Sequence, residues 1–249
     1  MSSFKQSDKI KKLESNKKRT HSSRQWLLRQ LNDPFVAKAK KEGYRSRAAF
    51  KFIEINEKYK LIKNGSRVLD LGAAPGGWCQ VSKTIVGDKG FVVGVDLLEI
   101  EPITGVEFLQ GNFHDDAMHA QILAMFQGQK ADAILSDMAA SSCGMSDVDH
   151  IRLIALLEAV FEFSFDLLRP GGSFVAKVLR GGTEHNLLSQ LKQSFVKVSH
   201  FKPKSSRQES SELYVVAQGF RPKKTQLKAD LPNSLNFNNT EIDQNNGTE

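Results

Sequence analysis

One stretch decides how this 249-residue chain folds: Asp70-Leu71-Gly72-Ala73-Ala74-Pro75-Gly76-Gly77-Trp78. It follows a short apolar run at residues 67–71 and opens a segment with helical character at residues 77–86. Glycines accept dihedral angles that other residues avoid, and small side chains let the backbone approach a ligand closely. The stretch therefore predicts a ligand-binding turn between the first strand and the next helix of an α/β domain.

The spacing of the glycines disfavours two classes of nucleotide-binding protein. Gly72 and Gly77 have the G-x-x-x-x-G spacing of a P-loop, but no Lys-Ser/Thr follows, which disfavours a nucleoside triphosphatase. The order also differs from the G-x-G-x-x-G of nicotinamide dehydrogenases, which makes that class the weakest rival. Asp96, at the end of the next expected strand, can bind both ribose hydroxyls of an adenosine moiety. The alternative is a tight turn, with Asp96 as a strand cap.

Apolar strands and amphipathic helices alternate around this turn. We expect helices at 34–41, 47–60, 77–86, 116–127, 148–168 and 184–194, and strands at 67–71, 91–96, 106–110, 131–137, 173–179, 196–202 and 212–219. Asp33 and Pro34 suit the start of the first helix and Gly43 its end, while Pro170-Gly171-Gly172 is expected to stop the long helix. The alternation predicts a mostly parallel sheet covered by helices, with ligands beyond the carboxyl ends of its strands.

Charge is distributed unevenly along the chain, whose net charge is +7. Residues 1–63 contain 18 Lys and Arg against 6 Asp and Glu, residues 64–191 contain 8 against 16, and residues 192–249 contain 9 against 6. A basic arm on an acidic core indicates a polyanionic partner, although a solvated basic tail has the same composition. We expect a disordered extension at 1–22, one domain at 23–220 with a basic helical segment at 23–63 and a core at 64–220, and a disordered tail at 221–249.

Other features exclude several classes of protein. Cys79 and Cys143 are too few for a disulfide framework or a zinc site, and the six histidines show no ligand spacing, so no metal is expected. No apolar run reaches the roughly 18 residues of a membrane span, and the polar N-terminus lacks a secretory signal. We expect a cytoplasmic protein without a membrane partner, and take a monomer as the default.

Five motifs occur in the order found in the FtsJ/RrmJ family, the bacterial ribosomal RNA large-subunit methyltransferases E, which this chain resembles from Gln25 to Gly219. They are Arg45-Ser46-Arg47-Ala48-Ala49-Phe50-Lys51, Asp70–Trp78, Ser136-Asp137-Met138-Ala139, Pro170–Lys177 and Ser205-Ser206-Arg207. The resemblance implies a Rossmann-like S-adenosylmethionine-dependent methyltransferase fold with a seven-stranded, mostly parallel sheet whose last strand is antiparallel. It also implies 2′-O-methylation of a uridine in the A-loop of 23S rRNA, on the assembled large ribosomal subunit.

The resemblance also implies where S-adenosylmethionine binds. Gly76 and Trp78 are expected at the methionine part, although Trp78 could instead fill the core, and Asn112 is expected beside the adenine, where the family usually has aspartate. A second departure is Ala140-Ser141, where the family usually has Pro-Asn. The expected cofactor-binding residues are Gly72, Ala73, Pro75, Gly76, Gly77, Trp78, Asp96, Asn112 and Asp137.

The family's Lys-Asp-Lys-Glu tetrad maps onto Lys51, Asp137, Lys177 and Glu212. Asp137 ends one expected strand and Lys177 lies in the next, and strands about 4.8 Å apart allow the two side chains to pair. A lysine in an apolar strand is rarely buried without a role or partner, whereas Lys51 and Glu212 alone would fit a solvated surface. We interpret Lys177 as accepting or steering the acceptor's proton, with Asp137 orienting it and Lys51 and Glu212 positioning the acceptor.

Basic residues on the same helical segment, and in the Ser-Ser-Arg motif, are expected to bind phosphates in a salt-dependent manner. Tyr44 and Phe50 are candidates for stacking on a flipped base, with core packing favoured for Phe50. The expected RNA-binding residues are Lys38, Lys40, Lys41, Arg45, Arg47, Lys204 and Arg207.

Two further functions are alternatives to ribose methylation. Enzymes that methylate base amino groups typically carry an Asn/Asp-Pro-Pro-aromatic motif after the fourth strand, where this chain has Ser136-Asp137-Met138-Ala139. A non-catalytic RNA-binding or ribosome-assembly factor could share the fold, but the intact tetrad argues against it.

Overall fold

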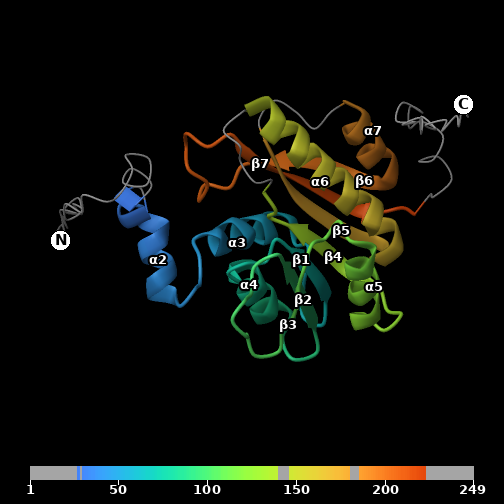
Figure 1. Cartoon of the computed structure of the whole chain (residues 1–249), viewed down its shortest axis with the longest axis horizontal. Helices are drawn as coiled ribbons and strands as arrows, with labels where there is room; N and C mark the ends of the chain where they lie inside the picture. Colours follow the sequence, from blue (N-terminus) through green and yellow to red (C-terminus); the bar gives the residue numbers. More distant parts are fainter. Residues whose placement is uncertain (1–26, 29, 140–145, 180–184, 223–249) are drawn as a thin grey trace, which may run out of the picture.

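Seven strands form one sheet in the order β3-β2-β1-β4-β5-β7-β6 (Figure 1). The structure is a computed structural model and describes residues 27–28, 30–139, 146–179 and 185–222. The strands are β1 Arg67–Leu71, β2 Phe91–Asp96, β3 Glu107–Gln110, β4 Ala131–Ser136, β5 Leu168–Leu179, β6 Phe195–Phe201 and β7 Glu212–Phe220. Neighbouring strands from β3 to β5 pair in parallel, and β7 is antiparallel to both β5 and β6. The expected fold class is confirmed.

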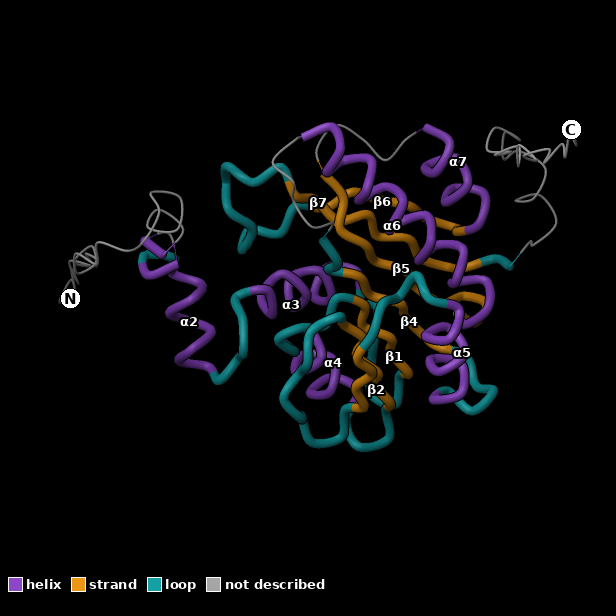
Figure 2. The backbone as a smooth tube through the Cα atoms, in the orientation of Figure 1, coloured by secondary structure: helices purple, strands orange, loops and turns teal. Residues whose placement is uncertain are grey.

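Helices cover both faces of this sheet (Figure 2). The helices α5 Asp116–Met125, α6 Ser146–Leu167 and α7 His185–Ser194 supply one hydrophobic cluster, and α3 Ala48–Tyr59 and α4 Gly77–Val86 supply the other. Successive residues of β1 divide between them, since Val68 belongs to the α3–α4 cluster and Leu69 to the other. Burial on both faces explains why the central strands are almost continuously apolar.

Helix α2, Pro34–Glu42, extends away from the sheet toward the N-terminus (Figure 1). The Asp33 side chain caps it by accepting a hydrogen bond from the Phe35 main-chain nitrogen at 3.0 Å. Pro34 occupies the first turn, and Gly43 ends the helix with a φ of 78°. All three expectations for this helix are confirmed.

The largest difference from the expected elements is at the start of β5. The strand begins at Leu168 rather than Ser173, so Pro170-Gly171-Gly172 lies within it. The pairing with β4 shifts there, from Ala131 opposite Leu168 to Ala133 opposite Ser173. A proline cannot donate to a strand ladder but is tolerated at such an irregularity. The other boundaries agree with the expected ones to within two residues.

Several expectations concern parts of the chain that the structure does not describe. The extension at 1–22, all but two residues of the tail at 221–249, Cys143, and the Ala140-Ser141 departure lie outside the described residues. Within the described ranges, no helix has both the length and the apolar character of a membrane span. In the same ranges, His, Cys, Asp and Glu form no group that could bind a metal ion.

Candidate active site

The carboxyl ends of β4 and β5 bring a carboxylate and an ammonium group together. Asp137 directly follows β4, and Lys177 lies in β5, which pairs in parallel with β4. Lys177 Nζ lies 3.2 Å from Asp137 Oδ1 and donates a hydrogen bond to the Asp137 main-chain oxygen at 2.7 Å. Only 8% of the Lys177 side chain is exposed, so this buried lysine has the partner expected from the sequence.

Tyr214 joins this pair to the other two residues of the tetrad. It lies opposite Lys177 in the β5–β7 ladder, and its hydroxyl donates to Asp137 Oδ1 at 2.7 Å. Lys51 Nζ donates to the same hydroxyl and to Glu212 Oε2, both at 3.2 Å. The five residues are termed the lysine–aspartate cluster. Sequence reasoning missed Tyr214, although it is two residues from Glu212 and so shares its face of the strand.

The charges of the lysine–aspartate cluster balance. Burial alone would raise the pKa of Asp137, but the ammonium groups of Lys177 and Lys51 and the Tyr214 hydroxyl hold that pKa below its ordinary value. Burial, and then the charge of Asp137, raises the pKa of Tyr214 well above its ordinary value. Asp137 is therefore an ionised acceptor, and Tyr214 is a protonated donor between two charged groups.

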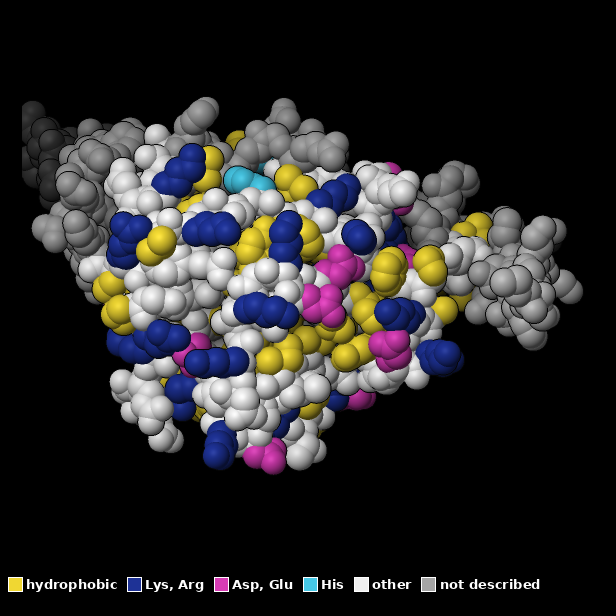
Figure 3. Space-filling view, turned by 180° about the vertical axis from the view of Figure 1, so that it is seen from behind, with side chains coloured by type: hydrophobic (Ala, Val, Ile, Leu, Met, Phe, Trp, Pro, Cys, Tyr) yellow, Lys and Arg dark blue, Asp and Glu magenta, His cyan; other side chains and the backbone are white. Residues whose placement is uncertain are grey.

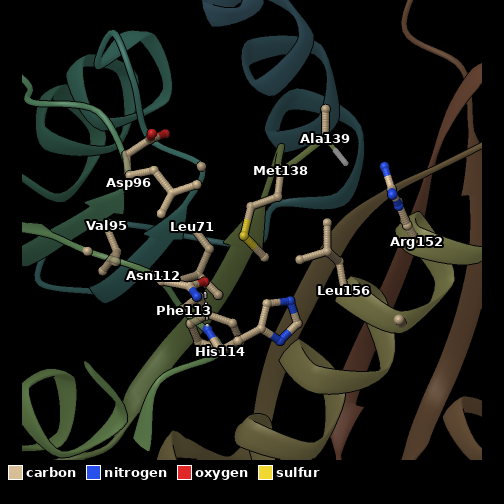
Figure 4. A pocket seen from close by; sticks show the side chains of 14 residues that line it. Leu71, Val95, Asp96, Asn112, Phe113, His114, Met138, Ala139, Arg152 and Leu156 are labelled. Atoms are coloured by element: carbon tan, nitrogen blue, oxygen red, sulfur yellow. Dashed lines mark hydrogen bonds between the residues drawn. The ribbon is translucent and has the colours of Figure 1, made fainter. Parts of the chain in front are cut away.

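A cavity of about 470 Å³ opens at the same edge of the sheet (Figure 4). Gly72, Asp96 and Asn112 line it, as does Met138, the residue after Asp137. The two carboxylate oxygens of Asp96 accept the main-chain N–H groups of Ala74 and Leu98, each at 2.9 Å. A carboxylate has about four acceptor positions, so Asp96 can still accept two ligand hydroxyls.

Glycine is required where the turn passes the cavity. Gly72 has a φ of +76°, and a Cβ there would lie 2.8 Å from the Met138 backbone. Gly76 has a φ of +108°, which other residues rarely adopt. The remaining expected cofactor residues do not line the cavity: they are Ala73, Pro75, Gly76 and Gly77, which continue the turn toward α4, together with Trp78 and Asp137.

The Trp78 ring packs inside the protein rather than against the cavity. It is 3% exposed, lies 5.1 Å from the Phe52 ring in a stacked arrangement, and lies 5.6 Å from the Tyr214 ring. Its indole nitrogen donates to the Ala48 main-chain oxygen at 2.8 Å. The ring therefore connects α4 to α3 and β7, which agrees with the alternative of core packing, and a contact of this residue with the methionine part stays a prediction.

Asn112 has a local role that an aspartate could not fill. Its side-chain oxygen accepts the His114 main-chain N–H at 3.1 Å, and its side-chain nitrogen donates to Asp115 Oδ1 at 3.3 Å. An aspartate would offer no donor to Asp115 and would add like charge beside it. The departure at this position is thus consistent with the turn that precedes α5.

Three further residues line the cavity that were not predicted as site residues from the sequence. His114 follows Asn112 by two positions, while Arg152 and Leu156 come from α6 (Figure 4). Arg152 and Leu156 are four residues apart, so they share one face of the helix. Nothing in the sequence alone indicates that this face of α6 borders the turn after β1.

The Arg45 guanidinium is engaged within the protein, and its role as a phosphate contact stays a prediction. Its guanidinium donates to the main-chain oxygens of Pro75 at 3.2 Å, Glu101 at 2.6 Å and Pro102 at 2.9 Å. Its main-chain nitrogen donates to the Gln80 side chain at 2.8 Å. Arg45 therefore links the segment between α2 and α3 to the loop at 101–102 and to the glycine-rich turn at residues 72–77, which is termed the cofactor turn because of the role expected for it.

Arg47 and Arg207 are also engaged, because both guanidinium groups contact Asp33 Oδ2. These three residues are termed the arginine cluster. The other expected RNA-binding residues are exposed: Lys38, Lys40, Lys41 and Lys204. The face shown in Figure 3 carries more Lys and Arg than Asp and Glu side chains.

Phe50 belongs to the core, which confirms the alternative favoured for it. It is 4% exposed, and its ring lies 5.7 Å from that of Phe35 and 5.5 Å from that of Tyr44. Its burial leaves no face for a base, whereas Tyr44 is half-buried.

A second buried carboxyl group lies in β1, behind the cofactor turn. Asp70 is fully buried, and its Oδ2 accepts a hydrogen bond from Cys79 Sγ at 3.1 Å. Burial raises the pKa of Asp70 to about 7, partly opposed by this bond, and burial together with Asp70 raises the pKa of the Cys79 thiol. Asp70 Oδ1 has no hydrogen-bond partner among the residues that the structure describes.

Comparisons with known proteins identify relatives that share one name. A relative from Granulibacter bethesdensis, a "Ribosomal RNA large subunit methyltransferase E", is 55% identical over 214 residues, which cover 86% of this chain and 92% of that one. A relative of the same name from Rickettsia akari is 50% identical over 84% of this chain and 94% of its own length.

A solved structure and a family model also identify methyltransferases as proteins similar to this chain. The crystal structure of a candidate ribosomal RNA methyltransferase from Plasmodium falciparum has a TM-score of 0.63 and 34% identity, over 71% of this chain and 98% of that one. The family model of FtsJ-like methyltransferases matches residues 44–220, which include the lysine–aspartate cluster, the cofactor turn and the cavity. The chain therefore belongs to the FtsJ-like methyltransferase family.

Proposed function

We propose that this chain transfers a methyl group from S-adenosylmethionine to the ribose 2′-hydroxyl of a uridine in the A-loop of 23S rRNA, on the assembled large ribosomal subunit. The observation that carries the proposal is the position of the lysine–aspartate cluster beside the cavity, since Asp137 directly precedes Met138 in its lining. The names of the relatives, which are 50–55% identical over most of the chain, support a ribosomal RNA substrate.

The residues around the cavity fit an adenosyl group. Asp96 has acceptor positions left for the two ribose hydroxyls, and Asn112 can accept from an adenine amino group with its side-chain oxygen. The turn from Gly72 to Gly77 would hold the methionine part, because the missing Cβ atoms bring the backbone to the ligand. S-adenosylmethionine supplies a methyl group already activated on a sulfonium.

The lysine–aspartate cluster would handle the proton of the acceptor hydroxyl. An ammonium group has three donors, and Lys177 uses two on oxygen atoms of Asp137. The third position is left for the acceptor oxygen. As an ammonium group, Lys177 would steer the acceptor hydroxyl by donating to its oxygen, and as the neutral amine it would take up the hydroxyl proton, while Asp137 fixes the orientation of the side chain. Lys51, bonded to Tyr214 and Glu212, would position the ribose together with Glu212.

The exposed lysines would hold the RNA by its phosphates. Lys38, Lys40 and Lys41 lie on α2, and Lys204 lies in the loop before β7. Such contacts give affinity that falls with salt and carry no sequence information themselves. Monomeric action and a cytoplasmic location remain predictions.

The test is methyl transfer by a Lys177→Ala variant to large ribosomal subunits from cells lacking this protein. We expect kcat to fall by a factor of about 10²–10⁴, the usual contribution of a positioned proton-transfer group. Lys192→Ala, on the exposed side of α7, is the matched control. A folded Lys177→Ala protein that binds cofactor and methylates at the wild-type rate would overturn the assignment, and recovery of a base-methylated nucleoside by mass analysis would overturn the ribose target.

A further inference from the structure

Two guanidinium groups share one carboxylate oxygen in the arginine cluster, between α2, α3 and the loop that follows β6. Arg47 Nη1 donates to Asp33 Oδ2, and Arg207 Nε donates to the same oxygen at 3.3 Å. The other carboxylate oxygen, Asp33 Oδ1, is occupied in capping α2 through the Phe35 N–H. Asp33 thus offers a single oxygen to two cations.

Donors of the arginine cluster remain unused. Within the part of the chain that the structure describes, Arg47 Nε and Arg207 Nη2 are buried without a hydrogen-bond partner, and so are the hydroxyls of Ser205 and Ser206. The two serines are 0% and 5% exposed. Buried polar groups without partners cost free energy, so an anion with more acceptor oxygens than Asp33 offers would be favoured here.

The charge of the cluster is also unbalanced. Burial lowers the pKa of Arg47, Asp33 opposes this shift, and the neighbouring Arg207 lowers the pKa further. Two guanidinium groups face one carboxylate, which leaves one positive charge without a direct counterion in the cluster. A phosphodiester carries one negative charge and two non-bridging oxygens, and arginine binds phosphate through paired N–H donors.

The arginine cluster is close to the lysine–aspartate cluster. Arg47 is the N-cap residue of α3 and has helical dihedral angles, so it lies on the same side of the helix as Lys51, four residues later. The charge of Glu212, the partner of Lys51, acts on Arg47. The exposed Lys204 adjoins Ser205, and Glu54 fixes both main-chain nitrogens, at 2.5 and 2.9 Å.

We propose that the arginine cluster binds a phosphodiester of the substrate RNA next to the methylated nucleotide, and that Asp33 is an internal anion which this phosphate displaces. The inference rests on the proposed function, because it takes RNA as the ligand. In the free protein, Asp33 neutralises part of the site and ties α2 to α3 and the loop at 203–207. An RNA phosphate gives each guanidinium its own acceptor oxygen, so RNA competes with Asp33.

The experiment compares RNA binding by the full-length wild type, Asp33→Asn and Asp33→Ser. Both substitutions remove the charge but keep a side-chain oxygen that can cap α2. Glu42→Gln is the matched control, because it removes one negative charge from the same helix at an exposed position 3.9 Å from Lys38. The probe is a fluorescein-labelled RNA hairpin with the A-loop sequence, followed by anisotropy at several salt concentrations, and cofactor titration checks the fold.

We expect both Asp33 variants to bind the hairpin about three- to tenfold more tightly than wild type, and Glu42→Gln to differ by less than about twofold. In an Arg207→Gln background, Asp33→Asn should gain little, and the slope of log affinity against log salt should fall by about one. Unchanged or weaker binding by the Asp33 variants would overturn the inference, since Asp33 would then merely hold the arginines in place.

Loss of the fold in both Asp33 variants would also overturn it, because a carboxylate that phosphate displaces cannot be indispensable for folding. Methyl transfer is scored separately, which distinguishes the two proposals. Tighter RNA binding by a protein that does not methylate ribose would contradict only the proposed function. Ribose methylation without tighter binding by the Asp33 variants would contradict only the displacement.

Discussion

Asp70 in β1 is fully buried and Asp137, directly after the neighbouring strand β4, is largely buried with 16% of its side chain exposed, yet their surroundings drive their protonation in opposite directions. Asp137 accepts from Tyr214 and pairs with the Lys177 ammonium, and its pKa lies below the ordinary value. Among the described residues, the Cys79 thiol is the one hydrogen-bond donor to Asp70, and burial raises the pKa of Asp70 to about 7. At this edge of the sheet, the protonation state of a carboxyl group is therefore set by the number of cations and hydrogen-bond donors beside it and not by burial alone.

We expect the largest loss of stability when the ionised carboxylate of Asp137 is removed. Asp137→Asn leaves the two ammonium groups of Lys177 and Lys51 without Asp137, and losing one partner of a buried ion pair costs about 3–5 kcal/mol. The folded-state pKa of Asp137 is depressed, so its contribution is present above the unfolded-state pKa and lost as the pH falls through the folded-state pKa. Urea unfolding at neutral and acidic pH measures both effects.

Asp88→Asn is the control for this prediction, because that side chain is fully exposed although Lys83 lies 3.7 Å away. It should leave the urea midpoint unchanged. Equal stability of Asp137→Asn and wild type at neutral pH would mean that Asp137 does not neutralise the buried lysines.

We expect Asp70 to make a smaller contribution to the free energy of unfolding, and one that falls as the pH rises, whereas the contribution of Asp137 is lost as the pH falls. The folded protein holds this proton up to about pH 7, whereas an unfolded aspartate releases it near 3.8. The stabilising contribution is therefore complete below about pH 4 and is lost as the pH rises to about 7, with a total of about 2–4 kcal/mol. Asp70→Asn stays neutral throughout, so its free energy of unfolding should lack this slope.

The measurement for Asp70 is a series of urea titrations across this pH range on wild type, Asp70→Asn and the exposed control Asp88→Asn. The control should keep the wild-type slope. An Asp70→Asn protein whose stability falls with pH as steeply as that of the wild type would show that Asp70 is ionised when folded.

The smallest effect on stability is expected for Tyr214→Phe. It removes the hydroxyl that joins Asp137 and Lys51 but keeps the ring that packs on Trp78. One hydrogen bond to a charged group contributes about 1.5–3 kcal/mol, so we expect a loss in this range and a lower kcat with cofactor KM unchanged. A variant with wild-type kcat would place Tyr214 outside the positioning of Lys51.

The sequence predicted the sheet and nearly all element boundaries because the apolar periods and the turn residues agree with each other. Asp33, Pro34 and Gly43 set the ends of α2 by local chemistry alone. The start of β5 could not be predicted this way, because Pro170-Gly171-Gly172 normally ends an element. Only its pairing with β4 shows that the chain remains in the sheet there.

The contacts between Lys51, Asp137, Lys177 and Glu212 followed from motif and strand position, whereas the state of the arginines did not. A sequence gives the charge of Arg45, Arg47 and Arg207 but not whether their donors are already used within the fold. The sequence also did not give the positions of the Trp78 and Tyr214 side chains. The ring of Trp78 was expected at the cofactor but fills the core, and the hydroxyl of Tyr214 was overlooked although it joins the charges.

Through its hydrogen bonds to three main-chain oxygens, Arg45 holds the segment between α2 and α3 against the cofactor turn and the loop at 101–102. If the proposed function holds, RNA bound to the lysines of α2 would lie on a segment that Arg45 joins directly to the turn at the cofactor cavity. A change in the position of α2 would then reach that turn through the Arg45 side chain, so RNA binding and cofactor binding would be linked.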